Sequence, residues 1–510
     1  MRRSLLLGSL ALASCFNPDP ADVDTEPGGG ESASSGGTSD LPSTTQTATT
    51  TSTSAGTSTT DSTTDTTEAT ATSTTESADT TRGDDSSSST TSTCVSDCDG
   101  RVCGGDGCGG QCGSCSFNES CEDDGTTCET IVDGCEDTGG YQPGSPWPTL
   151  GYCETRIFRS PLDGPTDEPS VLWTYDVAQP LNDIVIAADG TIYGGTNDGS
   201  LHAIDGSDGS EIWVTALGPQ PANEAPAIAA DGSIFVQTRS ATTQTGVLYK
   251  VSPEGDVLWD VSAGSGLEVS SSPLIASDGT VYVLSGSTVL GYDGGDGAAV
   301  FESDFLNSEF GTGGLARGPG GRFYVAGEDR LYGIEPNGSD FWEYLVGNDA
   351  FLQSYPAVTE DGVYFTGRGF ANYFVLLEAD DGSLVAERSP VSVDDSFAVS
   401  ATGRVFFGTT AESVVSANPS GTMLFDNWSV GAPTPISGEL LDFWTGRITL
   451  DRLGNSYRGW LDGTVLAIGP NGTPLWDLSL DGDFTAAVVV AENETLLVPG
   501  GDGLYALRVQ

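Results

Sequence analysis

The sequence is poor in basic side chains. Its 510 residues include one lysine, Lys250, and one histidine, His202. Lysine and arginine together number 18 against 73 aspartates and glutamates, for a formal net charge of −55. Phosphate binding needs clustered lysine and arginine, so this composition argues against a nucleic-acid partner. It favours a soluble acidic surface that repels other anionic surfaces.

Long apolar runs are also missing. The one N-terminal run, Leu5–Ala13, follows two arginines and is much shorter than the roughly 20 residues that span a bilayer. It therefore predicts an export signal and not a membrane-spanning helix. Its end, Leu12-Ala13-Ser14-Cys15, resembles a bacterial lipobox. The resemblance implies a signal peptide over residues 1–15, cleavage before Cys15 and lipidation of Cys15. By family analogy, Phe16 after the cysteine favours the outer membrane or cell surface, reached through the lipid anchor only.

Residues 16–93 lack apolar periodicity and consist largely of serine and threonine. A segment of this kind cannot bury enough apolar surface to offset its conformational entropy. We therefore expect a disordered tether, with O-glycosylation open on composition alone.

No cysteine follows Cys153, and all except Cys15 fall within residues 94–153. A dense, even set in an exported chain predicts a disulfide module whose pairing the sequence leaves open. The core of the segment resembles a Gly-rich, Cys-dense motif of secreted bacterial proteins. Metal binding at Cys112–Cys115 is the alternative, but a second such knuckle and a nearby histidine are missing. The predicted disulfide cysteines are Cys94, Cys98, Cys103, Cys108, Cys112, Cys115, Cys121, Cys128, Cys135 and Cys153.

After a connector over residues 154–170, a repeat begins. Its clearest copy, AIDGSDGSEIW at Ala203–Trp213, is a strand, a turn and a second strand that ends on an aromatic residue. A second hairpin, of the type ADGTIY, carries the Asp-Gly pair that strongly signals a β-hairpin. Its closing residues lie 40 to 51 positions apart: Tyr193, Phe235, Tyr282, Tyr324, Tyr364, Phe406, Tyr457 and Leu497.

The aromatic strand also occurs eight times, at Trp173, Trp213, Trp259, Phe301, Trp342, Ala386, Phe425 and Trp476. A period of 40–45 residues with four strands per unit is typical of a β-propeller blade. The first aromatic strand lacks partners and the chain ends with three strands, so joining them completes a blade and hides two open edges. We predict an all-β, eight-bladed and monomeric propeller over residues 171–510, closed by its N-terminal strand.

The unit AIDGSDGSEIW resembles the tryptophan-docking repeat of pyrroloquinoline-quinone-type propellers, Ala-x-Asp-x-x-Thr/Asp-Gly-x-x-x-Trp. In that family the tryptophans lock neighbouring blades together. The resemblance therefore implies structural docking roles for Trp173, Trp213, Trp259, Trp342 and Trp476.

Function is expected where the repeat is broken. The first-to-second and third-to-fourth turns of each blade are short, whereas the connections on the other face vary in length and suit recognition. The longest follows Trp428. The candidate binding patch is Trp428, Glu439, Asp442, Phe443, Trp444 and Arg447, and packing of this loop on its own blade is the alternative.

Catalysis is not predicted. One histidine, in a strand, does not assemble a Ser/His/Asp set, and Asp205, Asp208 and Glu211 fit turn residues better than a calcium loop. We therefore expect no cofactor and no metal, and a non-catalytic envelope lipoprotein that binds a protein or glycan. The resemblance leaves two alternatives, a quinone-dependent dehydrogenase-like enzyme with pyrroloquinoline quinone and calcium, and an outer-membrane protein assembly scaffold.

Overall fold

The computed structural model describes most of residues 139–510 and four short strands before them. The gaps after residue 139 are 219–221, 223, 240–244, 266–270, 287, 304–313, 328, 347–351, 353, 368–372, 389–392, 401, 410–412, 421–422, 432–445 and 501–502. The four short strands form two antiparallel pairs, which are β1 (Gly104–Gly105) with β2 (Gln111–Gly113) and β3 (Glu119–Cys121) with β4 (Cys128–Thr130). The predicted signal peptide, tether and Cys15 lie outside the described residues, as do most of the predicted disulfide cysteines.

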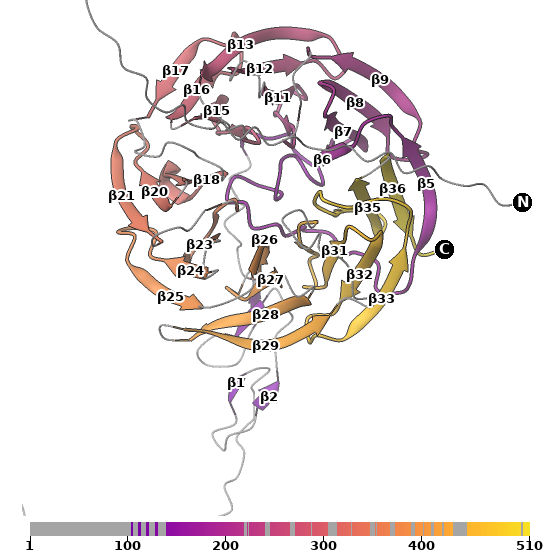
Figure 1. Cartoon of the computed structure of the whole chain (residues 1–510), viewed down its shortest axis with the longest axis vertical. Coiled ribbons are helices and arrows are strands. Elements are labelled where there is room, and N and C mark those ends of the chain that lie inside the picture. Colours follow the sequence, from indigo (N-terminus) through magenta and orange to yellow (C-terminus); the bar gives the residue numbers. More distant parts are fainter. Residues whose placement is uncertain are drawn as a thin grey trace, which may run out of the picture. The chain divides into compact units, whose positions relative to one another are not determined.

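The described part of the chain is built from four-stranded antiparallel units, each a simple meander. We number them 1 to 8 in chain order from β6. The first strands, nearest the centre in Figure 1, are β6 (Leu181–Ile186), β10 (Ala227–Ile228), β14 (Leu274–Ile275), β18 (Leu315–Arg317), β22 (Ala357–Thr359), β26 (Val393–Val399), β30 (Thr449–Leu450) and β34 (Val489–Ala491).

The second and third strands of each unit lie between the centre and the rim. The second strands are β7 (Thr191–Thr196), β11 (Ile234–Arg239), β15 (Thr280–Ser285), β19 (Phe323–Ala326), β23 (Gly362–Gly367), β27 (Val405–Thr409), β31 (Ser456–Gly459) and β35 (Thr495–Gly500). The third strands are β8 (Ser200–Asp205), β12 (Thr245–Val251), β16 (Thr288–Asp293), β20 (Arg330–Ile334), β24 (Tyr373–Leu377), β28 (Ser413–Ser420), β32 (Thr464–Ile468) and β36 (Gly503–Arg508). A 3-10 turn, Pro319–Gly321, precedes β19.

The outer strands are β9 (Glu211–Ala216), β13 (Val257–Ser265), β17 (Ala299–Glu302), β21 (Asp340–Leu345), β25 (Leu384–Arg388), β29 (Met423–Gly431), β33 (Pro474–Ser479) and β5 (Ser170–Asp176). The outer strand of unit 8 is the first strand of the propeller, because β36 pairs with β5 antiparallel over their whole length. The predicted pairing between the two ends of the repeat is thus present, and it closes the ring of sheets (Figure 1).

Except in unit 5, each outer strand docks on the next unit through one aromatic residue at a fixed register position. Trp213, opposite Ala203, donates its indole N–H to the Pro253 carbonyl at 2.8 Å. Its ring covers Gly255, where a Cβ would lie 2.8 Å from the ring and where φ is +93°. Only glycine fits this backbone conformation and this close approach without strain. Trp173, Trp342 and Trp476 make the same N–H···O bond with Gly206, Ala379 and Pro165.

Unit 6 departs from the sequence prediction. Its docking residue is Trp428, opposite Ser416, and not Phe425, which pairs with Asn418 nearer the turn. Trp428 donates to the Pro470 carbonyl at 3.0 Å and covers Gly472. The β28–β29 hairpin carries extra paired residues at its turn end, so the docking position falls three residues later than the turn spacing indicates. Placing Trp428 in a recognition patch was therefore wrong.

Unit 5 has no docking aromatic, because Ala386 occupies that position and is fully buried. Units 5 and 6 contact each other directly instead. Glu387 forms a parallel bridge with Met423, which merges the two meanders into one eight-stranded sheet. Arg388 and Asp426 form a two-point ion pair, with both N···O distances at 2.7 Å. Backbone pairing and charge thus take the place of the missing ring.

The segment 139–165 packs into the middle of the ring (Figure 1). Its backbone bonds to the inner strands of several units, as in Ile186 N–H to Trp147 O and Leu450 N–H to Phe158 O, both at 2.9 Å. Trp147 and Leu150 are fully buried in one core with residues of units 1, 2, 6, 7 and 8. Cys153, 2% exposed, is disulfide-bonded. Because no cysteine follows it, an intrachain partner must precede it.

The docking tryptophans allow a matched test of one hydrogen bond. Trp259 covers Gly297, but its buried indole N–H has no partner within the described residues. Lys250 bonds the nearby Gly294 carbonyl instead, at 2.8 Å. We expect Trp476→Phe to lose about 1 kcal/mol of unfolding free energy beyond its loss of packing, because its bond to Pro165 disappears. Trp259→Phe should show only the loss of packing, since the donor that it removes is unsatisfied.

Denaturant unfolding of the two variants beside the unaltered protein gives the comparison. Equal losses for Trp476→Phe and Trp259→Phe would show that the indole bond to Pro165 adds nothing to docking.

Candidate functional site

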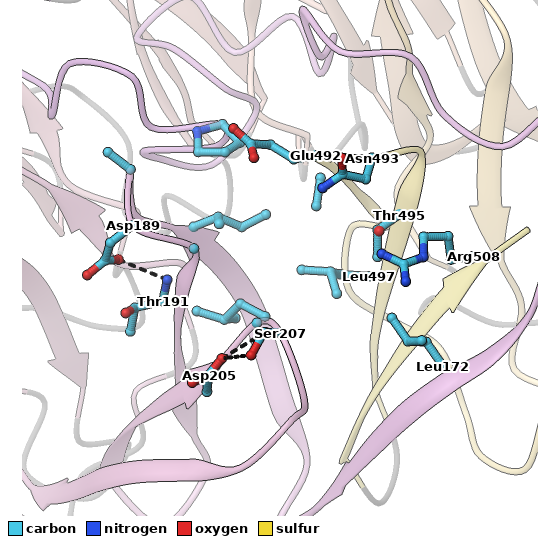
Figure 2. A pocket seen from close by; sticks show the side chains of 17 residues that line it. Leu172, Asp189, Thr191, Asp205, Ser207, Glu492, Asn493, Thr495, Leu497 and Arg508 are labelled. Atoms are coloured by element: carbon cyan, nitrogen blue, oxygen red, sulfur yellow. Dashed lines mark hydrogen bonds between the residues drawn. The ribbon is translucent and has the colours of Figure 1, made fainter. Parts of the chain in front are cut away.

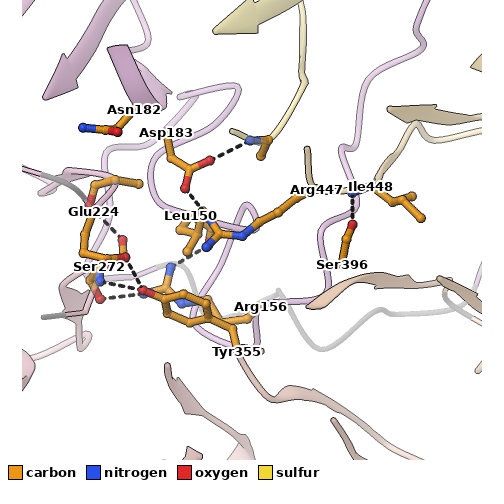
Figure 3. A network of polar contacts seen from close by, with 12 residues as sticks. Leu150, Arg156, Asn182, Asp183, Glu224, Ser272, Tyr355, Ser396, Arg447 and Ile448 are labelled. Carbon is orange, nitrogen blue, oxygen red and sulfur yellow. Dashed lines mark hydrogen bonds and ion pairs between the residues drawn. The ribbon is translucent and has the colours of Figure 1, made fainter. Parts of the chain in front are cut away.

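The two faces of the ring are closed differently at its centre. The short turns lie on one face, which we call the turn face, and the other connections lie on the loop face. Segment 139–165 bonds mainly to the inner strands near their turn-face ends, for example at Ile186, Ile228 and Arg452. At the opposite ends, where the inner strands begin, polar side chains from several units meet (Figure 3). We call this set the central network: Arg156, Asp183, Glu224, Ser272, Tyr355, Ser396 and Arg447.

Asp183 and Arg447 join units 1 and 7 across the centre. Asp183 lies in β6 and is 6% exposed, and Arg447 stands just before β30. Their side chains form an ion pair, and the second Asp183 oxygen accepts the Ala487 N–H at 2.6 Å. The guanidinium also lies over the Tyr355 ring, 5.3 Å from its centroid. Burial by itself lowers the pKa of Arg447, but the neighbouring carboxylates of Asp183 and Glu224 outweigh it and raise the pKa.

Tyr355 links units 2, 3 and 5. Its hydroxyl donates to Glu224 Oε2 at 2.6 Å and accepts the Ser272 N–H at 3.1 Å. Burial raises the pKa of Tyr355 well above its ordinary value, and the Glu224 carboxylate raises it further. The phenol therefore stays protonated and acts as a fixed donor to Glu224.

Arg156 ties the inserted segment to this network. It has no exposed surface, and its guanidinium donates to the Ser272 carbonyl at 2.9 Å, to Pro273 at 3.3 Å and to Leu315 at 3.4 Å. It also bonds Thr149 Oγ1 at 2.8 Å. Burial lowers the pKa of Arg156, and Tyr141 and Tyr355 oppose that effect. A buried arginine of this kind fixes the position of the segment against units 3 and 4.

The charges of the central network balance, because two arginines face Asp183 and Glu224. Each of these four side chains is engaged with a partner inside the protein. The arrangement suits a rigid floor beneath the loop face. Asn182 is at the same end of β6, and its amide donates to Ala222 O at 3.1 Å and to Asn197 Oδ1 at 3.2 Å.

Of the predicted patch, the structure describes Trp428 and Arg447, which lie in different parts of the ring. Trp428 lies at the docking position of β29, and Arg447 lies in the central network. Glu439, Asp442, Phe443 and Trp444 lie outside the described residues. Among the described residues, no group of three or more histidine, cysteine, aspartate or glutamate side chains could hold a metal ion. No helix in this part of the chain is long and apolar enough to cross a membrane.

The acidic residues around the first repeat act as turn and seam residues. Asp205 Oδ1 accepts the Ser207 N–H at 2.8 Å, and Asp208 Oδ1 accepts the Ser210 N–H at 2.9 Å. Glu211 Oε2 accepts from the Tyr175 hydroxyl at 3.0 Å, and His202 Nδ1 lies 2.9 Å from the same hydroxyl. His202 thus lies at the contact between the closing strand β5 and unit 1.

Sequence reasoning missed most of the central network. Asn182 and Asp183 interrupt an otherwise apolar inner strand, and Arg156 and Arg159 flank the apolar pair Ile157-Phe158 in the predicted connector. A carboxylate within a strand that is predicted to be buried indicates a polar partner inside the protein, and this signal could have been used. Glu224, Ser272 and Tyr355 carry no such signal, because only the ring places these loop residues together.

The ion pair between Asp183 and Arg447 should couple units 1 and 7. We expect Arg447→Met and Asp183→Asn each to destabilise the fold, with a loss of about 3 kcal/mol where a buried charge is left alone. The double variant should lose less than the sum of the two, because neither charge then remains without its partner. Chemical denaturation of all four proteins measures this coupling, and additive losses would mean that the pair does not join the two units.

His202 should give stability a pH dependence near neutrality. Burial lowers the pKa of His202, so the unfolded chain binds its proton more readily than the folded one. Unfolding free energy should then fall as the pH drops through the unfolded pKa of about 6.5. Because this is the only histidine, His202→Gln should flatten the profile between about pH 7.5 and 5.5. Parallel profiles in thermal unfolding at stepped pH would contradict this expectation.

Part of this chain is similar to a known protein family. A family model described as "Outer membrane protein assembly factor BamB" matches residues 165–309. The comparison with curated proteins finds no significant match.

Several solved structures share the fold. Quinohemoprotein alcohol dehydrogenase from Comamonas testosteroni is similar with a TM-score of 0.57 and 13% identity, covering 74% of this chain and 82% of that one. BamB from Moraxella catarrhalis gives 0.51 and 18%, covering 66% and 99%. A europium-containing methanol dehydrogenase gives 0.53 and 13%, covering 72% and 98%. At these identities the likeness concerns the fold. Together with the family match over residues 165–309, it shows that this chain carries a PQQ-like β-propeller repeat domain.

Proposed function

We propose that the protein is a non-catalytic, envelope-anchored binding protein whose eight-bladed propeller holds a protein or glycan partner on its loop face. The observation that carries the proposal is the filled centre. Trp147, Leu150 and Arg156 have no exposed surface, and they occupy the middle of the ring with side chains of the same chain. A ligand on the turn side of the axis would have to displace this core. Binding is therefore assigned to the loop face.

The central network supports a binding role over a catalytic one. Its guanidinium groups and carboxylates are each engaged with a partner inside the protein, and its tyrosine is held protonated. Proton transfer needs a group whose pKa lies near the working pH, and the pKa shifts of Tyr355 and Arg447 move both away from it. The network instead fixes the points from which the loops of units 2, 5 and 7 emerge. Rigid support beneath variable loops is a common basis for recognition.

The envelope part of the proposal rests on sequence. The resemblance of Leu12–Cys15 to a lipobox and the predicted tether over residues 16–93 support an exported, lipid-anchored protein, and the family match to an outer-membrane assembly factor supports a place at the envelope. A scaffold in outer-membrane protein assembly is one form that such a role would take, and the family match favours it over other envelope partners.

Dehydrogenase activity is the opposing hypothesis, since two of the similar structures are dehydrogenases. It predicts dye-linked oxidation of an alcohol or sugar by protein supplied with pyrroloquinoline quinone and calcium. Turnover under these conditions would overturn the proposed function.

The binding face can be tested by changing loops without touching the fold. We expect affinity capture from envelope fractions to recover a partner with the full exported chain. Capture should fall strongly when residues 432–445 are replaced by a short Gly-Ser linker, because the longest loop-face connection is then gone. The replacement keeps both the Trp428 docking contact and the Arg447 ion pair.

Glu254→Gln is the matched control. Glu254 is exposed in the turn between β12 and β13, on the turn face. Capture that survives the loop replacement but is lost in Glu254→Gln would move recognition to the opposite face and overturn the assignment.

A further inference from the structure

A cavity of about 510 Å³ lies between units 8 and 1 on the turn face. Its walls are the first turn of unit 1, with Asp189 and Thr191, and the turn of unit 8, with Glu492 and Asn493. Arg508 at the end of β36 and Leu172 of β5 complete one side. Figure 2 shows Asp189 and Asp205 across the cavity from Arg508 and Thr495. The volume lies within the range of small-molecule sites, about 300–1,000 Å³.

Unit 8 lacks the turn that joins the third strand to the fourth in the other units. Its third and fourth strands are β36 and β5, and Ser170 and Arg508, which face each other, lie 338 residues apart in the chain. The side chains of Arg508 and Leu172 at this end of unit 8 line the cavity.

The polar groups around the cavity have unused hydrogen-bonding capacity. Within the described residues, the Arg508 guanidinium has no hydrogen-bond or ion-pair partner, and neither does the Glu492 carboxylate. Asp189 Oδ1 accepts the Thr191 N–H at 2.9 Å, and Asp205 Oδ1 accepts from Ser207. The other oxygen of each aspartate accepts no hydrogen bond in the described part of the chain.

The junction of units 2 and 3 allows a comparison within the same protein. It holds a cavity of about 330 Å³ at the matching position, and its basic side chain is Lys250. Lys250 donates to the Gly294 carbonyl at 2.8 Å and to Asp231 at 3.2 Å. At that junction the Lys250 ammonium group is therefore bonded to groups of the protein itself. At the junction of units 8 and 1, Ala506 holds the strand position of Lys250, and the basic residue is Arg508, two positions further along β36. Its guanidinium has no such partner within the described residues and is available to another molecule.

We propose that this cavity, which we call the seam pocket, binds a neutral saccharide. A hydroxyl group both donates and accepts, so one ligand can donate to Asp189, Asp205 and Glu492 and accept from Arg508. The aliphatic side chains of Leu172, Ile192 and Leu497 offer apolar surface to the C–H faces of a sugar ring. The site is on the opposite face from the proposed partner site and does not depend on it.

Other ligand classes fit less well. An ammonium group has donors only, so a cationic ligand leaves Arg508 without an acceptor and places two positive charges side by side. An anionic ligand meets three carboxylates for one guanidinium. A purely apolar ligand would bury these groups without partners, which costs free energy.

Isothermal titration of the full exported chain tests the seam pocket. Maltose, cellobiose and N,N′-diacetylchitobiose are the neutral probes, spermidine is the cationic probe and glucuronate is the anionic probe. We expect saturable binding of at least one neutral disaccharide and weaker binding of both charged probes. Arg508→Gln should weaken the disaccharide by about tenfold or more, the usual effect of losing a hydrogen bond from a charged donor.

Arg452→Gln is the matched control, since Arg452 is an exposed arginine that is paired with Asp163 and does not line the pocket. Its affinity for the disaccharide should be unchanged. Thermal unfolding of Arg508→Gln should also be unchanged, because no protein contact is removed. Absence of saturable binding to all three disaccharides would overturn the proposal. Equal affinity in Arg508→Gln would also overturn it, as would tighter binding of spermidine or glucuronate.

Discussion

The structure depends on how the inner strands of the ring are held where they converge. Eight first strands approach a common centre, and their side chains alone leave the middle to be filled. The inserted segment fills it with Trp147, Leu150 and Phe158, each packed against strands of several units. Arg156 then satisfies carbonyl groups of units 3 and 4 that would otherwise be buried without donors. Burying an unpartnered carbonyl is costly, so this arginine is as much a part of the core as the apolar residues are.

The same stretch of chain also closes the ring. After crossing the centre it supplies the Pro165 carbonyl to Trp476, the place that a third-to-fourth turn fills in other units. It then becomes β5 and pairs with β36. One continuous piece thus fills the axis, replaces a missing turn and hides two strand edges. Its disulfide at Cys153 adds a covalent tie to residues that precede it.

The repeat made the four-stranded units, their order and the closing pair predictable from sequence. Strand alternation and Asp-Gly turns are local signals, and each unit repeats them. Phe425 was predicted in place of Trp428 as the docking residue of unit 6. The β28–β29 hairpin is longer than the corresponding hairpins of the other units, which shifts the docking position away from the turn. The role of residues 139–165 could not be read at all. Their irregular sequence has no period, and their contacts are with residues up to 311 positions away.

The central network and the seam pocket differ in a way that bears on function. In the central network, charges of opposite sign lie close together inside the protein and neutralise each other, as in the ion pair between Asp183 and Arg447. At the junction of units 8 and 1 they remain apart, with Arg508 on one wall and Asp189 on the other (Figure 2). A protein gains stability by satisfying its buried polar groups, so groups left open beside a cavity are available to a ligand. The junction that closes the ring is therefore where polar groups without a partner among the described residues face a cavity.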